Sequence, residues 1–514
     1  MLENKNIFGI KKEWLLNTFF FLFIAIILLN RIWLFFTINY NCIDNDQPIM
    51  WLGAKHYSQG IFHEPRFYGQ DYNTLMEALF AVPLIKMDVL VYFAVPIATH
   101  IIFLTPFLFT AIYLFIKKNK ESSLAVLGIL LCMPTGYDIM NSIPRGFVTG
   151  LFFTSLYVVS ILNPKNWTFI LVNTFLAYVG YLVNQNSVLV SAPFISYLFF
   201  INYKEKKYYI YSIIGFLLAL PINYLLNHFY TEHPNYVMYP ANNVFSFSFF
   251  KDAISHLDQR FAHISFFIEE KSILMIMLFL LIGIGLYKKN LKLFFSFLLF
   301  LLVIVVSFFS SKVSDGIVWP FYSYSRMYLG IPIALYLILI GSSIDLKKSI
   351  YIFIPVILIF SVYKELNFNN SIEYHTQEKM WGHVHLNTLD EIKIALETYK
   401  RICNEQHVTD FIIINSVWHD DEINYAGPAL FDDFPNTLKP SFERRTWRIE
   451  EEKSRIIDRF IIYTADCNFD KLAHEKYKNI DVTRLDDFGL FLIKNNKLKT
   501  SAFLKQIGAT AEGF

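Results

Sequence analysis

The sequence is poor in charged residues for its length. Asp, Glu, Lys and Arg make up 17% of the 514 residues, against about 25% in ordinary soluble domains. Hydrophobic residues make up 54% and aromatic residues 18%. This composition excludes an ordinary soluble protein and predicts a protein that crosses a membrane several times.

Cysteine is also scarce, with four in the chain. Cys403 and Cys467 both lie in the C-terminal part. They can form a disulfide in an oxidising compartment, but we favour two buried thiols. The chain has no small-residue cleavage site after its first apolar segment, residues 15–38. We therefore expect this segment to be a retained signal anchor.

Basic residues are concentrated in six short stretches between the apolar runs. They are Lys11/Lys12, Lys117/Lys118/Lys120, Lys165, Lys204/Lys206/Lys207, Lys288/Lys289/Lys292 and Lys347/Lys348. If all six are cytoplasmic, the positive-inside rule is satisfied and the N-terminus is cytoplasmic. About eleven spanning helices then fit between them, near residues 15–38, 89–116, 122–141, 147–162, 167–184, 187–203, 208–227, 272–287, 291–310, 327–344 and 350–363.

An odd number of spans places the C-terminal segment outside the cell membrane, with the loops 39–88, 228–271 and 311–326. From about residue 367 the composition becomes mixed and charged. Residues 387–404 have helical spacing, and residues 411–417, 460–464 and 489–494 are typical of buried strands. We expect a polytopic α-helical membrane domain over residues 1–366 and a soluble extracytoplasmic α/β domain over residues 367–514.

The first outer loop carries two carboxylates, Asp44 and Asp46, directly after the first apolar segment. Carboxylates at the edge of a bilayer are costly and indicate a functional site. Residues 47–59 are predicted to form a helix, with Pro48 in its first turn and Gly60 as its end. Asp46 then stands at the N-cap position, which leaves Asp44 unexplained. One acid is expected to do chemistry while the other orients, caps or binds an ion.

Further along this loop come His63, Glu64 and Asp71. These side chains can bind an acceptor or a metal ion, but a solvated loop is the simpler interpretation of His63 and Glu64. The loop as a whole is expected to form a polar roof over the helices.

The first outer loop resembles that of the GT-C integral-membrane glycosyltransferases. The resemblance rests on the acidic pair, Ala54 in an aromatic-rich helix, Gly60, the run Gly69-Gln70-Asp71-Tyr72, and Pro83. It implies transfer of a sugar, with inversion, from a polyprenyl-phosphate carrier to a lipid, glycan or protein acceptor on the outer face. The family's spacing favours Asp46 as the base, whereas the capping argument favours Asp44.

Four residues outside this loop are candidates for substrate binding. Arg326, among aromatic residues that include Tyr324, matches the placement of a family residue that reaches the carrier phosphate; a snorkelling arginine is the alternative. Asp138 and Arg145 bracket an outer turn and can be a second acid and a phosphate contact, or a mutual ion pair. Arg31 is explained by snorkelling.

A divalent metal is compatible with this chemistry, but no metal site follows from the sequence. His375, His383, His385 and the run 419–422 match no established ligand spacing, and solvated loops explain them. Two other classes of function stay open. A flippase or transporter of lipid-linked saccharides needs charges near the midplane and often paired broken helices, and a membrane anchor needs only a binding domain. No nucleic-acid partner is expected.

Overall fold

The computed structural model describes residues 6–7, 10–269, 271–347, 349–376, 380–381, 384–414, 421–440, 443–465, 469, 480–486, 489–495, 499–507 and 509. The chain divides into two compact units. Unit 1 comprises Met1–Ile38, Thr99–Leu225 and Asn242–Gln377, and unit 2 comprises Asn39–Ala98, Leu226–Ala241 and Glu378–Phe514. The first outer loop therefore belongs to the same unit as the C-terminal segment.

Among the described residues, five helical segments are long and apolar enough to cross a membrane. They are α1 (Lys12–Thr37), α4 (Val91–Ile116), α11 (Lys206–Glu232), α14 (Ser272–Lys289) and Tyr324–Gly341, which contains η4 (Tyr324–Tyr328) and α17 (Ile331–Gly341). Two bent pairs raise the number to seven if each is one span: α5 (Lys120–Leu131) with α6 (Thr135–Ser142), bent by 88°, and α18 (Ile350–Leu366) with α19 (Phe368–Thr376), bent by 56°. The described residues thus support a membrane protein with five to seven candidate spans, and the predicted count of about eleven is not confirmed.

The other predicted spans lie on shorter apolar helices. These are α7 (Thr149–Phe152), α8 (Tyr157–Leu162), α9 (Trp167–Val183), α10 (Val188–Asn202) and α15 (Leu291–Ser307). A helix rises about 1.5 Å per residue. Helices of 17 residues or fewer therefore fall short of a bilayer core of about 30 Å.

Short elements complete the described part of unit 1. They are β1 (Asn6–Ile7), β2 (Ile10–Lys11), η1 (Gln185–Ser187), α12 (Phe247–Ser255), α13 (Leu257–Arg260), α16 (Ser311–Ser314) and η3 (Pro320–Tyr322). Pro134 separates α5 from α6, because a proline restricts the residue before it and donates no backbone hydrogen bond.

Unit 2 contains the helices of the first outer loop and the C-terminal sheet region. Its elements are α2 (Asp46–Ser58), α3 (Met76–Ile85), η2 (Pro234–Tyr236), β3 (Met380–Trp381), β4 (Val384–His385), α20 (Leu389–Glu405), β5 (Asp410–Ile414), α21 (Asp421–Leu430), β6 (Asn436–Leu438), α22 (Thr446–Ser454), β7 (Arg459–Thr464), β8 (Ile480–Arg484), β9 (Leu490–Asn495) and α24 (Thr500–Gln506). One apolar core joins α2 and α3 to α20 and α21. The first loop and the C-terminal segment therefore share a core.

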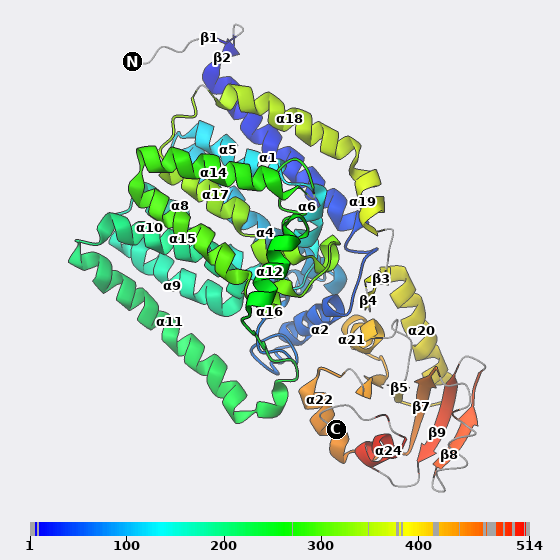
Figure 1. The fold of residues 1–514 in the computed structure, drawn as a ribbon. Helices are drawn as coiled ribbons and strands as arrows, with labels where there is room; N and C mark the ends of the chain where they lie inside the picture. Colours follow the sequence, from blue (N-terminus) through cyan, green and yellow to red (C-terminus); the bar gives the residue numbers. More distant parts are fainter. Residues whose placement is uncertain are drawn as a thin grey trace. The chain divides into compact units, whose positions relative to one another are not determined.

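A five-stranded mixed sheet has the order β6-β5-β7-β9-β8. Its labelled strands β5, β7, β9 and β8 follow one another in Figure 1. Strand β5 runs parallel to β6 and β7, whereas β9 runs antiparallel to β7 and β8. Both faces are buried, because Phe411 packs with Cys403 of α20 and Ile412 packs with Phe503 of α24. Burial on both faces explains why β5 is apolar from Phe411 to Ile414.

The sequence predicted one helix and three strands of the C-terminal part of unit 2. The helix predicted over residues 387–404 is α20, and it begins with a capping box in which Thr388 and Glu391 bond to each other's backbone N–H groups. Three predicted strands are present as β5, β7 and β9. Cys403 is buried, and Cys467 lies outside the described residues.

Candidate functional site

The two carboxylates of the first outer loop have different surroundings. Oδ1 of Asp44 accepts the backbone N–H groups of Asp46 at 3.2 Å and Gln47 at 3.4 Å. Asp44 is 4% exposed, whereas the Asp46 side chain is 33% exposed. The prediction that Asp46 caps the helix is wrong. Because α2 begins at Asp46 itself, it is Asp44 that accepts the backbone N–H groups of the first helical turn.

Arg444, from the C-terminal segment, is the ionic partner of Asp46. Its guanidinium nitrogen lies 2.8 Å from Oδ1 of Asp46, and its side chain is 11% exposed. The guanidinium stacks on the ring of Tyr239 at 5.2 Å, and the backbone N–H donates to the hydroxyl of Tyr425 at 3.0 Å. Burial lowers the pKa of Arg444, but the charge of Asp46 outweighs burial and raises the pKa above its usual value.

Two residues of the run 69–72, Gly69 and Asp71, bond to the segment that carries Tyr239. The carbonyl of Gly69 accepts the N–H of Tyr239 at 3.0 Å, and Oδ1 of Asp71 accepts the N–H of Ala241 at 2.6 Å. Gly69 has a φ of +72°, and a Cβ there would lie 3.0 Å from the carbonyl oxygen of Arg444. Asp71 therefore positions the segment whose Tyr239 stacks on Arg444.

Glu64 is fully buried, so the solvated-loop interpretation is wrong for it. One carboxyl oxygen accepts the N–H of Gly69 at 3.2 Å, and the other accepts the hydroxyl of Tyr230 at 3.2 Å. Burial raises the pKa of Glu64 to about 8, although these two hydrogen bonds oppose the rise. Glu64 is therefore largely protonated at neutral pH.

His63 belongs to a cluster of rings near the end of α2. Its imidazole stacks on Trp447 at 3.8 Å between ring centroids, and Tyr68 meets Trp447 edge-on at 4.5 Å. Nδ1 of His56 lies 3.0 Å from the hydroxyl of Tyr68. Burial lowers the pKa of His63, and it lowers that of His56 to about 3. The cluster is therefore a packed group of rings around Trp447 in which Tyr68 is fully buried.

Arg145 and Arg326 are both buried in unit 1. Arg326 donates to the carbonyls of Tyr322 at 3.3 Å and Ser323 at 2.9 Å, and Asp315 lies 3.8 Å from its guanidinium. Arg145 donates to the carbonyl of Phe321. Burial and the nearby charge of Arg326 lower the pKa of Arg145 to about 9. Two like charges are thus held close together inside the fold.

Unit 1 also contains a cavity of about 360 Å³. Its wall includes Met327 and Tyr328, which directly follow Arg326, and apolar residues of α15. Polar side chains also line it, namely Gln185, Asn186, Asn243 and Lys312. Tyr324 is half-buried, with the guanidinium of Arg260 over its ring at 4.3 Å.

Asp138 does not pair with Arg145. It lies 2.6 Å from the guanidinium of Arg31 and accepts a hydrogen bond from Lys364. All three side chains are buried. The snorkelling interpretation of Arg31 is therefore wrong, because its charge is neutralised inside unit 1 by an acid from α6.

Three side chains of unit 1 are close enough to hold a metal ion. They are His263, Glu269 and His375, whose ligand atoms all lie within 4.8 Å of one another. Burial raises the pKa of Glu269, but the two imidazoles outweigh burial and lower it below its usual value. The solvated-loop interpretation is wrong for His375, which is 2% exposed. Residues 382–383 and 415–420, including His383, lie outside the described residues.

The roles of Arg444, His263 and Glu269 in these sites were not predicted from the sequence. Arg444 is separated from Asp46 by almost four hundred positions in the chain, and no spacing pattern connects them.

Comparison with known proteins does not identify the function, because no family model, curated protein or solved structure matches this chain. The function must therefore be argued from the geometry of these sites.

Proposed function

We propose that this protein transfers a sugar from a polyprenyl-phosphate carrier to a hydroxyl acceptor, with inversion, and that Asp46 is the general base. In this reaction the acceptor oxygen attacks the anomeric carbon while the bond from that carbon to the phosphate oxygen breaks. Asp46 takes the hydroxyl proton, and the lipid phosphate leaves with the bonding electrons.

The observation that carries this proposal is the contrast between Asp44 and Asp46. Asp44 is buried, and its carboxylate accepts two backbone N–H groups at the N-terminus of α2. Asp46 is one-third exposed and is held by Arg444 through Oδ1, so an acceptor can reach it. A positioned carboxylate of this kind accelerates proton transfer by about 10²- to 10⁴-fold.

The carrier phosphate needs cationic donors and its lipid needs an apolar wall. Two buried guanidinium groups, those of Arg145 and Arg326, repel each other, and a bound anion would relieve that repulsion. Arginine also matches phosphate oxygens two at a time. The cavity that includes Met327 and Tyr328 combines apolar residues of α15 with Lys312 and Asn186, a mixture that suits a lipid phosphate.

The test is transfer of labelled sugar from polyprenyl-phosphate donors by membranes that contain the protein. Asp46→Asn should lower transfer by about 10²- to 10⁴-fold, because the amide cannot accept the proton. Asp44→Asn should keep most of the activity, because asparagine also caps helices well. Asp390→Asn, at an exposed position of α20, is the matched control. Equal activity of Asp46→Asn and the control would falsify the assignment of the base.

One observation favours a second candidate, movement of lipid-linked saccharides across the membrane. The buried cluster of Asp138, Arg31 and Lys364 lies among the candidate spans, and ionisable residues there often mark transport pathways. Reconstituted vesicles discriminate between the two. A transporter moves labelled donor to the other leaflet without acceptor, and Asp138→Asn lowers that rate, whereas a transferase needs the acceptor.

A further inference from the structure

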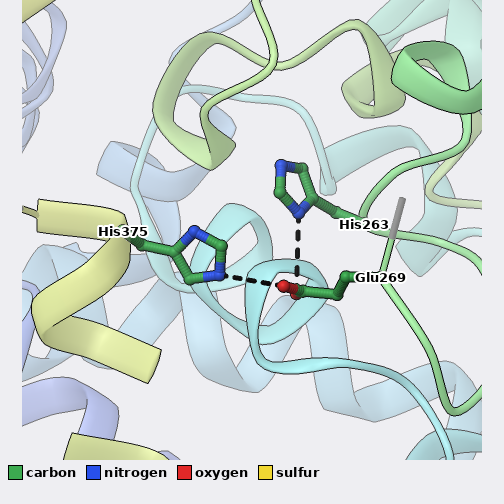
Figure 2. A group of neighbouring side chains, drawn as sticks. All are labelled: His263, Glu269 and His375. Atoms are coloured by element: carbon green, nitrogen blue, oxygen red, sulfur yellow. Dashed lines mark hydrogen bonds and ion pairs between the residues drawn. The ribbon is translucent and has the colours of Figure 1, made fainter. Parts of the chain in front are cut away.

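His263, Glu269 and His375 come from separate parts of unit 1. His263 and Glu269 lie in the connection between α13 and α14, and His375 lies in α19. Nε2 of His375 is 3.1 Å from one Glu269 oxygen, and Nδ1 of His263 is 3.6 Å from the other. Both imidazoles are 1% exposed and point at the Glu269 carboxylate (Figure 2).

A neighbouring carbonyl determines which nitrogen of His263 carries a proton. Nε2 of His263 lies 2.5 Å from the carbonyl oxygen of Val318. A carbonyl only accepts, so Nε2 must donate and hold a proton. In the neutral ring the lone pair is then on Nδ1, which is buried and has no hydrogen-bond partner. That lone pair faces the Glu269 carboxylate at 3.6 Å, an arrangement that a metal ion between the two groups would stabilise.

The surroundings fit a metal ion. A carbonyl acceptor on the far nitrogen is the usual second-shell partner of a metal-binding histidine. Gly136 donates its N–H to Oε1 of Glu269 at 2.8 Å, which orients the carboxylate. A Cβ on Gly136 would lie 2.2 Å from Nδ1 of His263 and 2.7 Å from Oε1 of Glu269. The cluster is thus built around a position that only glycine can occupy.

We propose that His263, Glu269 and His375 bind one divalent transition-metal ion, with Zn²⁺ the best match. Two imidazoles and one carboxylate are a common ligand set for Zn²⁺, with bond lengths of about 2.0–2.2 Å and a fourth position left for water or a substrate oxygen. The ligand atoms lie within 4.8 Å of one another. A shift of roughly 1 Å would bring them to the spacing that those bond lengths require.

The metal would tie the connection before α14 to α19, the second helix of the bent pair α18 and α19. The Glu269 side chain is 25% exposed, so the cluster has access to solvent on that side. The competing explanation is a metal-free cluster in which His263 is a protonated imidazolium paired with Glu269. The two explanations differ in metal content.

The first experiment measures metal in the full-length protein, purified in detergent without added metal and then exposed to Zn²⁺ and desalted. Elemental analysis should find one Zn²⁺ per chain in the wild type. His263→Gln, Glu269→Gln and His375→Gln should each lower the content at least tenfold. His256→Gln is the matched control, because His256 is an exposed histidine of the same region and should leave the content unchanged.

A second measurement avoids the variants that remove a ligand. The wild type, stripped by chelator and reloaded with Co²⁺, should show the intense visible absorption of a tetrahedral site with nitrogen and oxygen ligands. Zn²⁺ should abolish this absorption by competition, and Gly136→Ala should prevent it because a methyl group fills the site. Less than a tenth of an equivalent of Zn²⁺ in the wild type, or full content in all three ligand variants, overturns the proposal in favour of the imidazolium pair.

Discussion

The raised pKa of Glu64 predicts how the free energy of unfolding depends on pH. The carboxyl is fully buried and its pKa is raised from 4.5 to about 8. Below pH 4.5 the folded and unfolded chains both hold the proton, so ionisation costs nothing. Between pH 4.5 and about 8 the unfolded chain releases the proton while the folded chain keeps it, and stability therefore falls as the pH rises.

The size of the effect follows from the same values. Each pH unit in this window lowers the free energy of unfolding by about 1.4 kcal/mol, so the whole window corresponds to about 5 kcal/mol. Glu64→Gln removes the titration while glutamine can still pair with Gly69 and Tyr230. The variant should match the wild type near pH 4.5 and become increasingly more stable than it as the pH rises.

The assay is thermal unfolding of the detergent-solubilised protein at a fixed scan rate, from about pH 5 to about pH 9. The difference in Tm between Glu64→Gln and the wild type should grow with pH and level off above the raised pKa. Glu397→Gln, at an exposed position of α20, controls for loss of one negative charge. Parallel curves for Glu64→Gln and the wild type would refute the assignment of a buried, largely protonated carboxyl.

Three further substitutions test other parts of the sites. Asp44→Ala should lower the free energy of unfolding by about 1 kcal/mol through loss of the helix cap, and Asp44→Asn should not; chemical denaturation of both variants measures this. Gly69→Ala should cost about 1–3 kcal/mol, because its φ is +72° and its Cβ would approach the carbonyl of Arg444, and sugar transfer should fall with the displaced arginine. Asp138→Asn should cost about 3–5 kcal/mol, because Arg31 and Lys364 would remain buried without their acid, and thermal scans should show a large fall in Tm.

Helices and strands could be predicted from the sequence where interactions between neighbouring residues determine them. The helix α20, the strand β5 and the end of α2 at Gly60 follow from periodicity, capping and glycine placement. The candidate spans were recognised as apolar helices, but lengths and breaks depend on packing. The start of α2 was wrong by one residue, and that error exchanged the cap between Asp46 and Asp44.

Partners from distant parts of the chain could not be predicted. Glu64 looked like a solvated acid because nothing near it in the sequence indicates that Tyr230 covers it. Arg31 looked like a snorkelling residue because its acid, Asp138, lies in another helix. Spacing along one chain contains no information about which two segments pack together, so every such pairing had to come from the fold.

The pairing of Asp46 with Arg444 changes the role expected for the C-terminal segment. The acid belongs to the first outer loop, but the arginine that orients it comes after β6, and both rest on the core shared by α2 and α21. Arg444 is therefore a positioning residue for the proposed base, and Arg444→Lys should lower the turnover number more than the affinity for the acceptor, because lysine keeps the charge but loses the planar fork. If the C-terminal segment were only an appended binding module, this conservative change would leave turnover unaltered.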